Sequence, residues 1–313
     1  MNIIKPSYKI EERDEQRGGM AIIEKVARTC YKTEDAITEG SAERMVRMLI
    51  QRQHYAMLEH GDYIFFLEDY HLLNIVACAL RRLMEETGVV PLLTFTNINH
   101  RPIISGNIRA WREFIGSGSS AAFYFIGSID PVFIEDFVSR DDMVVDRRVR
   151  QIYYSDLMGE VERSVHLRQT VRFVVDRGVT HEFVRHRVMS FAQESTRYCD
   201  YSSGKYGDGI TVIEPSFLTK HTETYDLWKR QCMSADAAYI HEKRLGLKPE
   251  QARTVLPQST KAELVMTGTL RQWNHFFDMR ARQITGKAHP QAVEVAVPLM
   301  QEMAARFPDV IRA

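Results

Sequence analysis

The stretch THEFVRHRVMSFAQESTRYCDY, residues 180–201, is the most informative part of the chain. It places Arg185, His186 and Arg187 side by side and adds a serine, a glutamine and another arginine within ten residues. Guanidinium groups suit phosphate or carboxylate, which they bind through two parallel hydrogen bonds. These residue types therefore indicate an anion-binding site, although a basic helix end followed by a polar loop explains the composition alone more simply.

Local signals within this stretch predict its conformation. Thr180 is a favourable N-cap residue, so we expect a short helix that carries Arg185–Arg187. The two histidines of HEFVRH, His181 and His186, are five residues apart. Five residues turn a helix by about 500°, so the two rings would point roughly 140° apart and could not share one zinc ion. We predict no metal site.

The rest of the chain predicts an α+β fold, with a mixed or antiparallel sheet flanked by helices. Helical spacing of apolar residues or a capping signal predicts three helices, over 222–245, 270–280 (capped by Thr269 with Gln272) and 290–307. Alternating or apolar runs predict strands at Tyr63–Leu67, Leu92–Thr96, Thr170–Val175 and Glu263–Thr267. Helices and strands do not alternate regularly, which argues against a doubly wound sheet. Residues 116–150 are expected to be irregular.

One motif in the irregular region resembles a nucleotide loop by letters alone. GSGSSA, residues 116–121, fits G-x-G-x-x-A, but it follows an expected helix over residues 107–115. A dinucleotide cradle needs a strand before the glycines and a helix after them. We therefore interpret GSGSSA as a turn.

Composition narrows the class of protein. The chain has 313 residues, of which 44% are hydrophobic, and its formal net charge is zero because 41 basic residues match 41 acidic ones. A protein that binds nucleic acid usually has more basic than acidic residues, so we expect no nucleic-acid partner. The four cysteines form no C-x-x-C pair, and no apolar run approaches membrane-spanning length. The prediction is a cytoplasmic protein with no membrane partner, in one domain over residues 1–313.

Several motifs together resemble one known family. Arg185-His186-Arg187, followed after seven residues by Ser195, resembles the signature of the flavin-dependent thymidylate synthases (the ThyX family), and Ser195–Tyr198 resembles their S-x-R-Y. Cys30 follows an A-R-T that is similar to the family's Ala-Arg-x-Ser/Cys, and HYAMLEH, residues 54–60, resembles H-x-S/T-P-x-E-H. LRQWNHFFDMR, residues 270–280, and residues 288–294 resemble the family's late segments. The likeness covers about 27–61 and 166–313, so we expect a ThyX-like fold with an insertion of about a hundred residues at about 69–165.

The resemblance implies a specific activity. Members methylate dUMP to dTMP, with methylenetetrahydrofolate as the one-carbon donor, reduced FAD as the hydride source and NADPH as the reductant of the flavin. They are homotetramers whose active sites are shared between chains, and they need no cysteine nucleophile.

Carried over by position, the resemblance implies two sets of ligand-binding residues. The flavin-binding set would be His54, Arg185, His186, Arg187, Gln193, Thr269, Arg271 and His275. The dUMP-binding set would be Glu182, Arg185, Gln193, Ser195, Thr196, Arg197, Arg253 and Arg280, with Ser195 and Arg197 reaching in from a neighbouring chain.

Arg280 is the candidate catalytic residue. A ring carbon of uracil is a poor nucleophile, and a guanidinium fixed at the pyrimidine edge stabilises negative charge spread over the ring. The flavin carries the redox step, so the protein need only bind, orient and polarise. Without the resemblance, Arg253 and Arg280 would be interpreted as ordinary helix surface charge.

Five positions depart from the family pattern. Ala56 stands where Ser or Thr is common, and Cys30 stands at the Ser position with weaker hydrogen bonding. Ala192-Gln193 replaces the frequent Asn-Glu. Glu182 replaces a common Gln, and a carboxylate there would repel the phosphate unless it is paired. These departures concern how the ligands bind rather than which reaction occurs.

Two other classes of protein remain as alternatives. A thymidylate synthase of the cysteine type would use Cys199 as nucleophile, with a thiolate beside its base and no flavin. A noncatalytic nucleotide- or RNA-binding module would use the basic loop and would bind with steep salt dependence.

Overall fold

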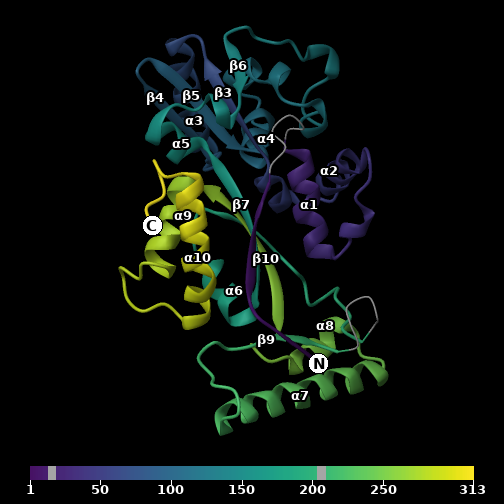
Figure 1. The fold of residues 1–313 in the computed structure, drawn as a ribbon. Helices are drawn as coiled ribbons and strands as arrows, with labels where there is room; N and C mark the ends of the chain where they lie inside the picture. Colours follow the sequence, from purple (N-terminus) through teal and green to yellow (C-terminus); the bar gives the residue numbers. More distant parts are fainter. Residues whose placement is uncertain (13–18, 203–208) are drawn as a thin grey trace.

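A four-stranded antiparallel sheet forms the centre of the molecule in the computed structural model, which describes residues 1–12, 19–202 and 209–313 (Figure 1). Its strands in spatial order are β2 (Ser7–Glu11), β7 (Arg168–Asp176), β10 (Lys261–Thr269) and β8 (Ser190–Gln193). One face buries Val171, Phe173 and Val175 of β7 in an apolar core. The opposite face meets helix α1 (Met20–Tyr31).

Two C-terminal helices cover the apolar face of the central sheet. They are α9 (Leu270–Arg280), which follows β10 directly, and α10 (Pro290–Arg306) (Figure 1). Trp273, Phe276 and Phe277 of α9 are fully buried in this core. Because β10 is paired along its whole length with β7, the start of α9 is fixed relative to the sheet.

A second antiparallel sheet lies at one end of the molecule (Figure 1). Its strands in spatial order are β4 (Leu93–Ile98), β5 (Arg101–Asn107), β3 (Asp62–Leu67) and β6 (Val149–Ile152). Its neighbours are α2 (Ser41–Gln51), the 3-10 helix η3 (Tyr55–His60), α3 (Tyr70–Thr87), α4 (Ile108–Gly116) and α5 (Gly159–His166). One face forms a core around Phe65, Trp111 and Phe125, and Ile64 on the other face joins the core of the central sheet. The two sheets therefore form one packed body.

The opposite end of the molecule carries a long helix (Figure 1). A parallel pair of short strands, β1 (Asn2–Ile4) and β9 (Thr211–Ile213), packs with α7 (Glu223–Arg244) and the short helix α8 (Pro249–Ala252). Tyr201 belongs to this small core, so the end of the 180–201 stretch is anchored here.

The structure confirms most of the predicted elements. The helices predicted over 222–245, 270–280 and 290–307 are α7, α9 and α10, and the four predicted strands are β3, β4, β7 and β10. Thr269 and Gln272 form the predicted capping box. GSGSSA follows α4, as expected, and 3-10 turns occupy much of 116–150, although Val149 and Arg150 belong to β6. The result is a mixed fold of helices and antiparallel sheets.

The predicted helix around Arg185–Arg187 is wrong. Helix α6 (Arg177–Phe183) starts earlier, because Asp176 at the end of β7 accepts a hydrogen bond from the Val179 N–H at 2.8 Å. Thr180 lies inside α6, and its hydroxyl donates to the Arg177 carbonyl at 2.9 Å. The three basic residues lie in the turn after the helix. In the part of the chain described, no helix is both long and apolar enough to cross a membrane.

Candidate active site

Arg280, the last residue of α9, forms a three-way contact with Glu182 and His186. Its Nη1 donates to Glu182 Oε2 at 2.6 Å, its Nη2 donates to the Glu182 carbonyl at 3.2 Å, and its Nε donates to His186 Nε2 at 3.0 Å. The Arg280 side chain is 16% exposed. The fold thus brings Arg280 to two predicted site residues that lie almost a hundred positions earlier in the chain. We call these three residues the Arg280 cluster.

His186 is held neutral in this cluster. Burial, followed by the positive charge of Arg280, lowers its pKa to about 4. Because Nε2 accepts from Arg280, the ring hydrogen is on Nδ1. The buried Nδ1 has no hydrogen-bond partner among the described residues. A buried N–H without an acceptor is costly, so this atom is a candidate contact for a bound ligand.

Other predicted flavin-binding residues lie on α9 and on the turn after α6, the elements that carry the cluster. The His275 ring lies 6.0 Å from that of His186, measured between centroids. Arg185, Arg187, Arg271 and His275 are exposed. Gln272 donates from Nε2 to the Val188 carbonyl at 3.2 Å, which ties the turn carrying the three basic residues to α9. The sequence predicts only the capping role of Gln272.

Thr269 and Gln193 have local partners in the structure. The Thr269 hydroxyl accepts from the Gln272 N–H at 3.3 Å and caps α9. The Gln193 amide on β8 donates to the Thr180 hydroxyl on α6 at 3.1 Å. Both contacts hold the elements that surround the Arg280 cluster.

A second cluster contains predicted dUMP-binding residues. Arg197 pairs with Glu250 of α8, with Nε and Oε2 2.9 Å apart, and Arg253 donates to the Thr196 hydroxyl at 3.4 Å. The Ser195 hydroxyl accepts from the Arg197 N–H at 3.3 Å. Hydrogen bonding to Glu250 raises the pKa of Arg197, which stays charged. We call this group the Arg197 cluster.

Tyr31, which no sequence motif singled out, connects His54 to the Arg197 cluster. The His54 Nδ1 is 3.1 Å from the Tyr31 hydroxyl, and the Tyr31 ring is 6.3 Å from that of Tyr198. The Arg197 guanidinium in turn lies 5.5 Å from the Tyr198 ring centroid. The signal for Tyr31 was its position directly after Cys30 in the A-R-T-C segment.

Glu194 anchors the loop that carries the Arg197 cluster. It is 3% exposed, accepts from Lys261 Nζ at 2.7 Å, and accepts from the Glu263 N–H at 3.1 Å. Both partners belong to β10, so the loop leaves the central sheet from a fixed point.

The two clusters make no described side-chain contact with each other within one chain. No described hydrogen bond or ion pair joins a side chain of the Arg280 cluster to one of the Arg197 cluster. Within one chain, the predicted dUMP-binding residues therefore form two groups, each with its own partners.

Cys199 does not suit the role of a nucleophile. It is 1% exposed, and burial followed by the nearby Glu194 carboxylate raises its pKa to about 12. A thiol with so high a pKa stays protonated and is a weak nucleophile. This observation counts against the cysteine-type alternative.

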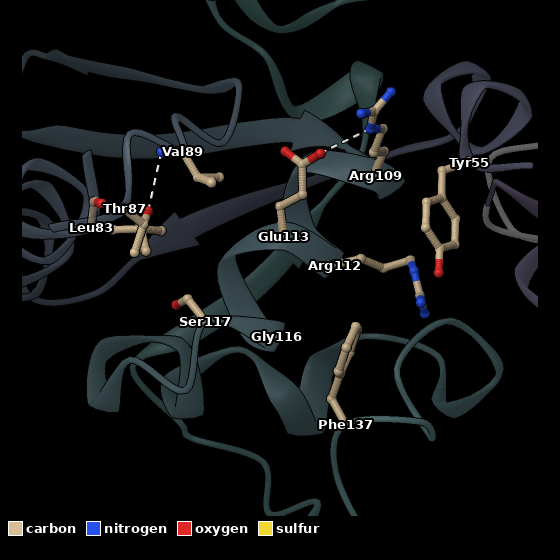
Figure 2. A pocket seen from close by; sticks show the side chains of 10 residues that line it. All are labelled: Tyr55, Leu83, Thr87, Val89, Arg109, Arg112, Glu113, Gly116, Ser117 and Phe137. Atoms are coloured by element: carbon tan, nitrogen blue, oxygen red, sulfur yellow. Dashed lines mark hydrogen bonds and ion pairs between the residues drawn. The ribbon is translucent and has the colours of Figure 1, made fainter. Parts of the chain in front are cut away.

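A cavity of about 360 Å³ lies elsewhere, between α3 and α4 (Figure 2). Its charged wall groups are paired, Arg109 with Glu113 and Arg112 with Asp136. It is lined by Tyr55, Leu83, Thr87, Val89, Arg109, Arg112, Glu113, Gly116, Ser117 and Phe137, none of which was a predicted site residue. Among residues 1–12, 19–202 and 209–313, no three His, Cys, Asp or Glu side chains are grouped to hold a metal ion.

Comparison with known proteins gives consistent matches. The family model described as thymidylate synthase complementing protein matches residues 143–309. A flavin-dependent thymidylate synthase from Pyrococcus furiosus is 31% identical over 217 residues, which are 68% of this chain and 79% of the relative. One from Pyrococcus abyssi is 30% identical over 153 residues, 48% of this chain, and the match spans 61% of that relative.

A solved structure is similar at a lower level. The UMP/dUMP methylase PolB from Streptomyces cacaoi, bound with 5-Br dUMP, aligns over 100% of this chain and 99% of its own. The TM-score is 0.42 and the sequence identity 15%. A similarity this low does not bear on the site.

Proposed function

This chain belongs to an enzyme family, the flavin-dependent thymidylate synthases, and from that premise we propose that it methylates dUMP to dTMP. In this proposal methylenetetrahydrofolate supplies the one-carbon unit, and NADPH reduces the flavin. The observation that carries the proposal is the Arg280 cluster, in which the candidate catalytic guanidinium meets His186 of the Arg-His-Arg motif.

The residues around the cluster fit a flavin dinucleotide. The buried Nδ1–H of His186 has no partner in the part of the chain that the structure describes, and the exposed Arg185, Arg187 and Arg271 offer guanidinium groups for a diphosphate. His275 and, from a neighbouring chain, His54 would complete the binding set. Bound FAD supplies the hydride for the reaction.

In the proposed mechanism the protein orients and polarises the nucleotide. Arg197 and Arg253 would hold the dUMP phosphate, with Ser195, Thr196 and Gln193 as hydrogen-bonding partners. Arg280 would face the pyrimidine edge and stabilise negative charge that develops on the ring. Its three hydrogen bonds fix the guanidinium in place, so little reorganisation would be needed during the reaction.

Each cluster binds its own partners within one chain, which fits a site shared between chains. A nucleotide that touches both Arg280 and Arg197 would take them from different copies of the chain. We therefore propose a homotetramer in the cytoplasm, with active sites at the contacts between subunits. The segment at about 69–165, which includes α3, α4 and most of the second sheet, is proposed to be an insertion into one catalytic domain.

The visible absorbance spectrum of the purified protein tests this proposal. We expect flavin bands after FAD is added, and a change in these bands when dUMP is added, because both ligands would occupy one site. Absence of flavin binding would contradict the proposal and would favour a noncatalytic nucleotide-binding module.

A further inference from the structure

Lys32, which follows Tyr31 at the end of α1, connects two parts of the proposed site. Its ammonium group contacts the Glu263 carboxylate on β10 and lies 3.9 Å from Oε2 of Glu194. The Lys32 and Glu263 side chains are each 14% exposed, and Glu194 is buried. These charges are therefore largely shielded from water, so they attract one another more strongly than they would at a surface.

Lys32 also balances the charge of this group. Lys261 Nζ is 2.7 Å from Glu194 Oε2 and 3.0 Å from Glu263 Oε1, so the two carboxylates share this lysine. Arg172 lies 3.6 Å from Glu263, but it is shared with two further carboxylates. Without Lys32, two largely buried carboxylates would have one lysine between them and would repel each other.

Glu194 connects Lys32 to the loop that carries the proposed phosphate-binding residues. Ser195 follows Glu194 directly, and Arg197 lies two residues further on. The Glu194 N–H donates to the Glu263 carbonyl at 2.8 Å, and its carboxylate accepts from the Glu263 N–H at 3.1 Å. A shift of Glu194 would therefore displace Ser195 and Arg197 as well.

Tyr31 connects Lys32 to the proposed flavin-binding residue His54. The Tyr31 hydroxyl is 3.1 Å from Nδ1 of His54, and the Tyr31 ring is 6.3 Å from the Tyr198 ring. Lys32 ends α1 in a left-handed conformation, with φ at 53°, and its N–H donates to the Arg28 carbonyl. The ion pairs of Lys32 therefore fix the point from which Tyr31 reaches His54.

We propose that Lys32 is a positioning residue that holds His54, through Tyr31, in register with Arg197. The inference rests on the proposed function, in which one chain offers both residues to its neighbour's site, His54 to the flavin and Arg197 to the nucleotide phosphate. Because one set of contacts places both residues, a ligand that orders one of them favours binding of the other ligand. Lys32 thereby couples dUMP binding to FAD binding.

Lys32→Met tests this role. Methionine is unbranched at Cβ like lysine, so it meets the left-handed backbone at a similar cost, but it carries no charge. With FAD in excess, KM for dUMP should rise at least about tenfold while kcat stays nearly unchanged, because Arg280 keeps its partners. The affinity for FAD, measured by titration, should increase on addition of dUMP in the wild type but not in the variant.

Lys25→Met is the matched control on the same helix. Lys25 pairs with the buried Glu11 on β2, and not with the loop after β8. This variant should keep the wild-type KM and the wild-type effect of dUMP on FAD affinity. Lys32→Arg retains the positive charge and should recover most of the loss in KM.

Glu194→Gln in the Lys32→Met background tests the charge balance. It removes the surplus negative charge, so KM should fall between the values of Lys32→Met and the wild type, with the coupling to FAD still lost. If Lys32→Met does not fold, this double variant still reports on a site without Lys32.

The outcomes separate the inference from the proposed function. A wild-type KM with wild-type coupling in either variant that lacks Lys32, or no recovery in Lys32→Arg, would overturn the inference and leave dUMP methylation intact. Failure of the wild-type protein to form dTMP would instead overturn the proposed function, and the inference with it.

Discussion

At the scale of single residues, Arg280 combines a fixed orientation with partial burial. Its three hydrogen bonds join the end of α9 to α6 and to the turn that follows α6. Such an arrangement suits a group that stabilises charge, because the guanidinium is already oriented and needs little reorganisation during the reaction.

Arg280→Lys tests this role. A lysine keeps the charge but lacks the planar fork that contacts Glu182 and His186 together. We expect kcat/KM for dTMP formation to fall by about 10²–10³-fold, the usual cost of losing one preorganised donor. Arg306→Lys, in an exposed pair with Glu302 on α10, is the control. Unchanged turnover in Arg280→Lys would defeat the assignment.

Tyr31→Phe tests the link between His54 and the flavin. The variant keeps the ring beside Tyr198 and removes only the hydroxyl that contacts His54 at 3.1 Å. Loss of one hydrogen bond costs about 1 kcal/mol, so FAD should bind about fivefold more weakly. Tyr70→Phe, at an exposed position, should bind FAD like the wild type. Equal FAD affinity in Tyr31→Phe and the wild type would remove Tyr31 from the site.

At the scale of elements, the sequence predicted helices correctly where contacts within one element determine their bounds. The Thr269–Gln272 capping box and the apolar stripe of α7 are readable because they depend on spacing within one helix. Thr180 failed as a cap because Asp176, at the end of a buried strand, offered a better acceptor four residues earlier. Asp176 can cap the helix only because β7 ends at this residue, and the sequence alone did not show where β7 ends.

Thr269→Ala tests the cap of α9. Loss of the hydroxyl should destabilise the first turn by about 1 kcal/mol. Hydrogen exchange of the amides at Gln272 and Trp273, measured without flavin, should become about fivefold faster. Thr269→Ser keeps the cap and should exchange like the wild type. Equal exchange in Thr269→Ala would mean that Gln272 and the core hold the turn without it.

Buried neutral histidines at the ends of elements predict sensitivity to acid. Burial lowers the pKa of His166, at the end of α5, to about 4, and burial followed by Arg168 lowers that of His60 to about 3. His166 is 2.7 Å from the Thr96 hydroxyl and 2.6 Å from the Ser105 hydroxyl, and so joins α5 to the second sheet.

The sign of the effect follows from proton counting. Below about pH 6.5 the unfolded chain protonates these rings and the folded chain does not, so stability falls as the pH drops from 6.5 towards 4. Each histidine contributes up to about 1.4 kcal/mol per pH unit in this window. Thermal midpoints from pH 7 to pH 5 should decrease, and less steeply in His166→Gln. A flat profile would show that these rings are not neutral and buried.

At the scale of the whole molecule, the sequence could not predict which of the site residues contact one another. The family resemblance named the residues, but only the fold shows that Arg280 meets Glu182 and His186. It also shows that Arg197 pairs with Glu250 and that Arg253 donates to Thr196. Tyr31 and Glu194 were missed because their roles depend on contacts between distant segments. Contacts between distant segments produce no periodic pattern in the sequence.

Mixing variants tests the shared site. Arg280→Ala and Arg197→Ala should each be nearly inactive alone. When their subunits are exchanged, some active sites would receive both wild-type arginines, and up to about a quarter of the wild-type activity should return. The molar mass in solution, measured by light scattering, should correspond to four chains. A fully active monomer, or no recovery after confirmed subunit exchange, would contradict the shared site.

The most direct measurement is the formation of dTMP from dUMP, followed by mass spectrometry with isotope-labelled methylenetetrahydrofolate. With FAD and NADPH present, we predict labelled dTMP, and we predict none when FAD is removed from the protein. Formation of dTMP that does not depend on FAD, or no dTMP from protein with FAD and dUMP bound, would contradict the account.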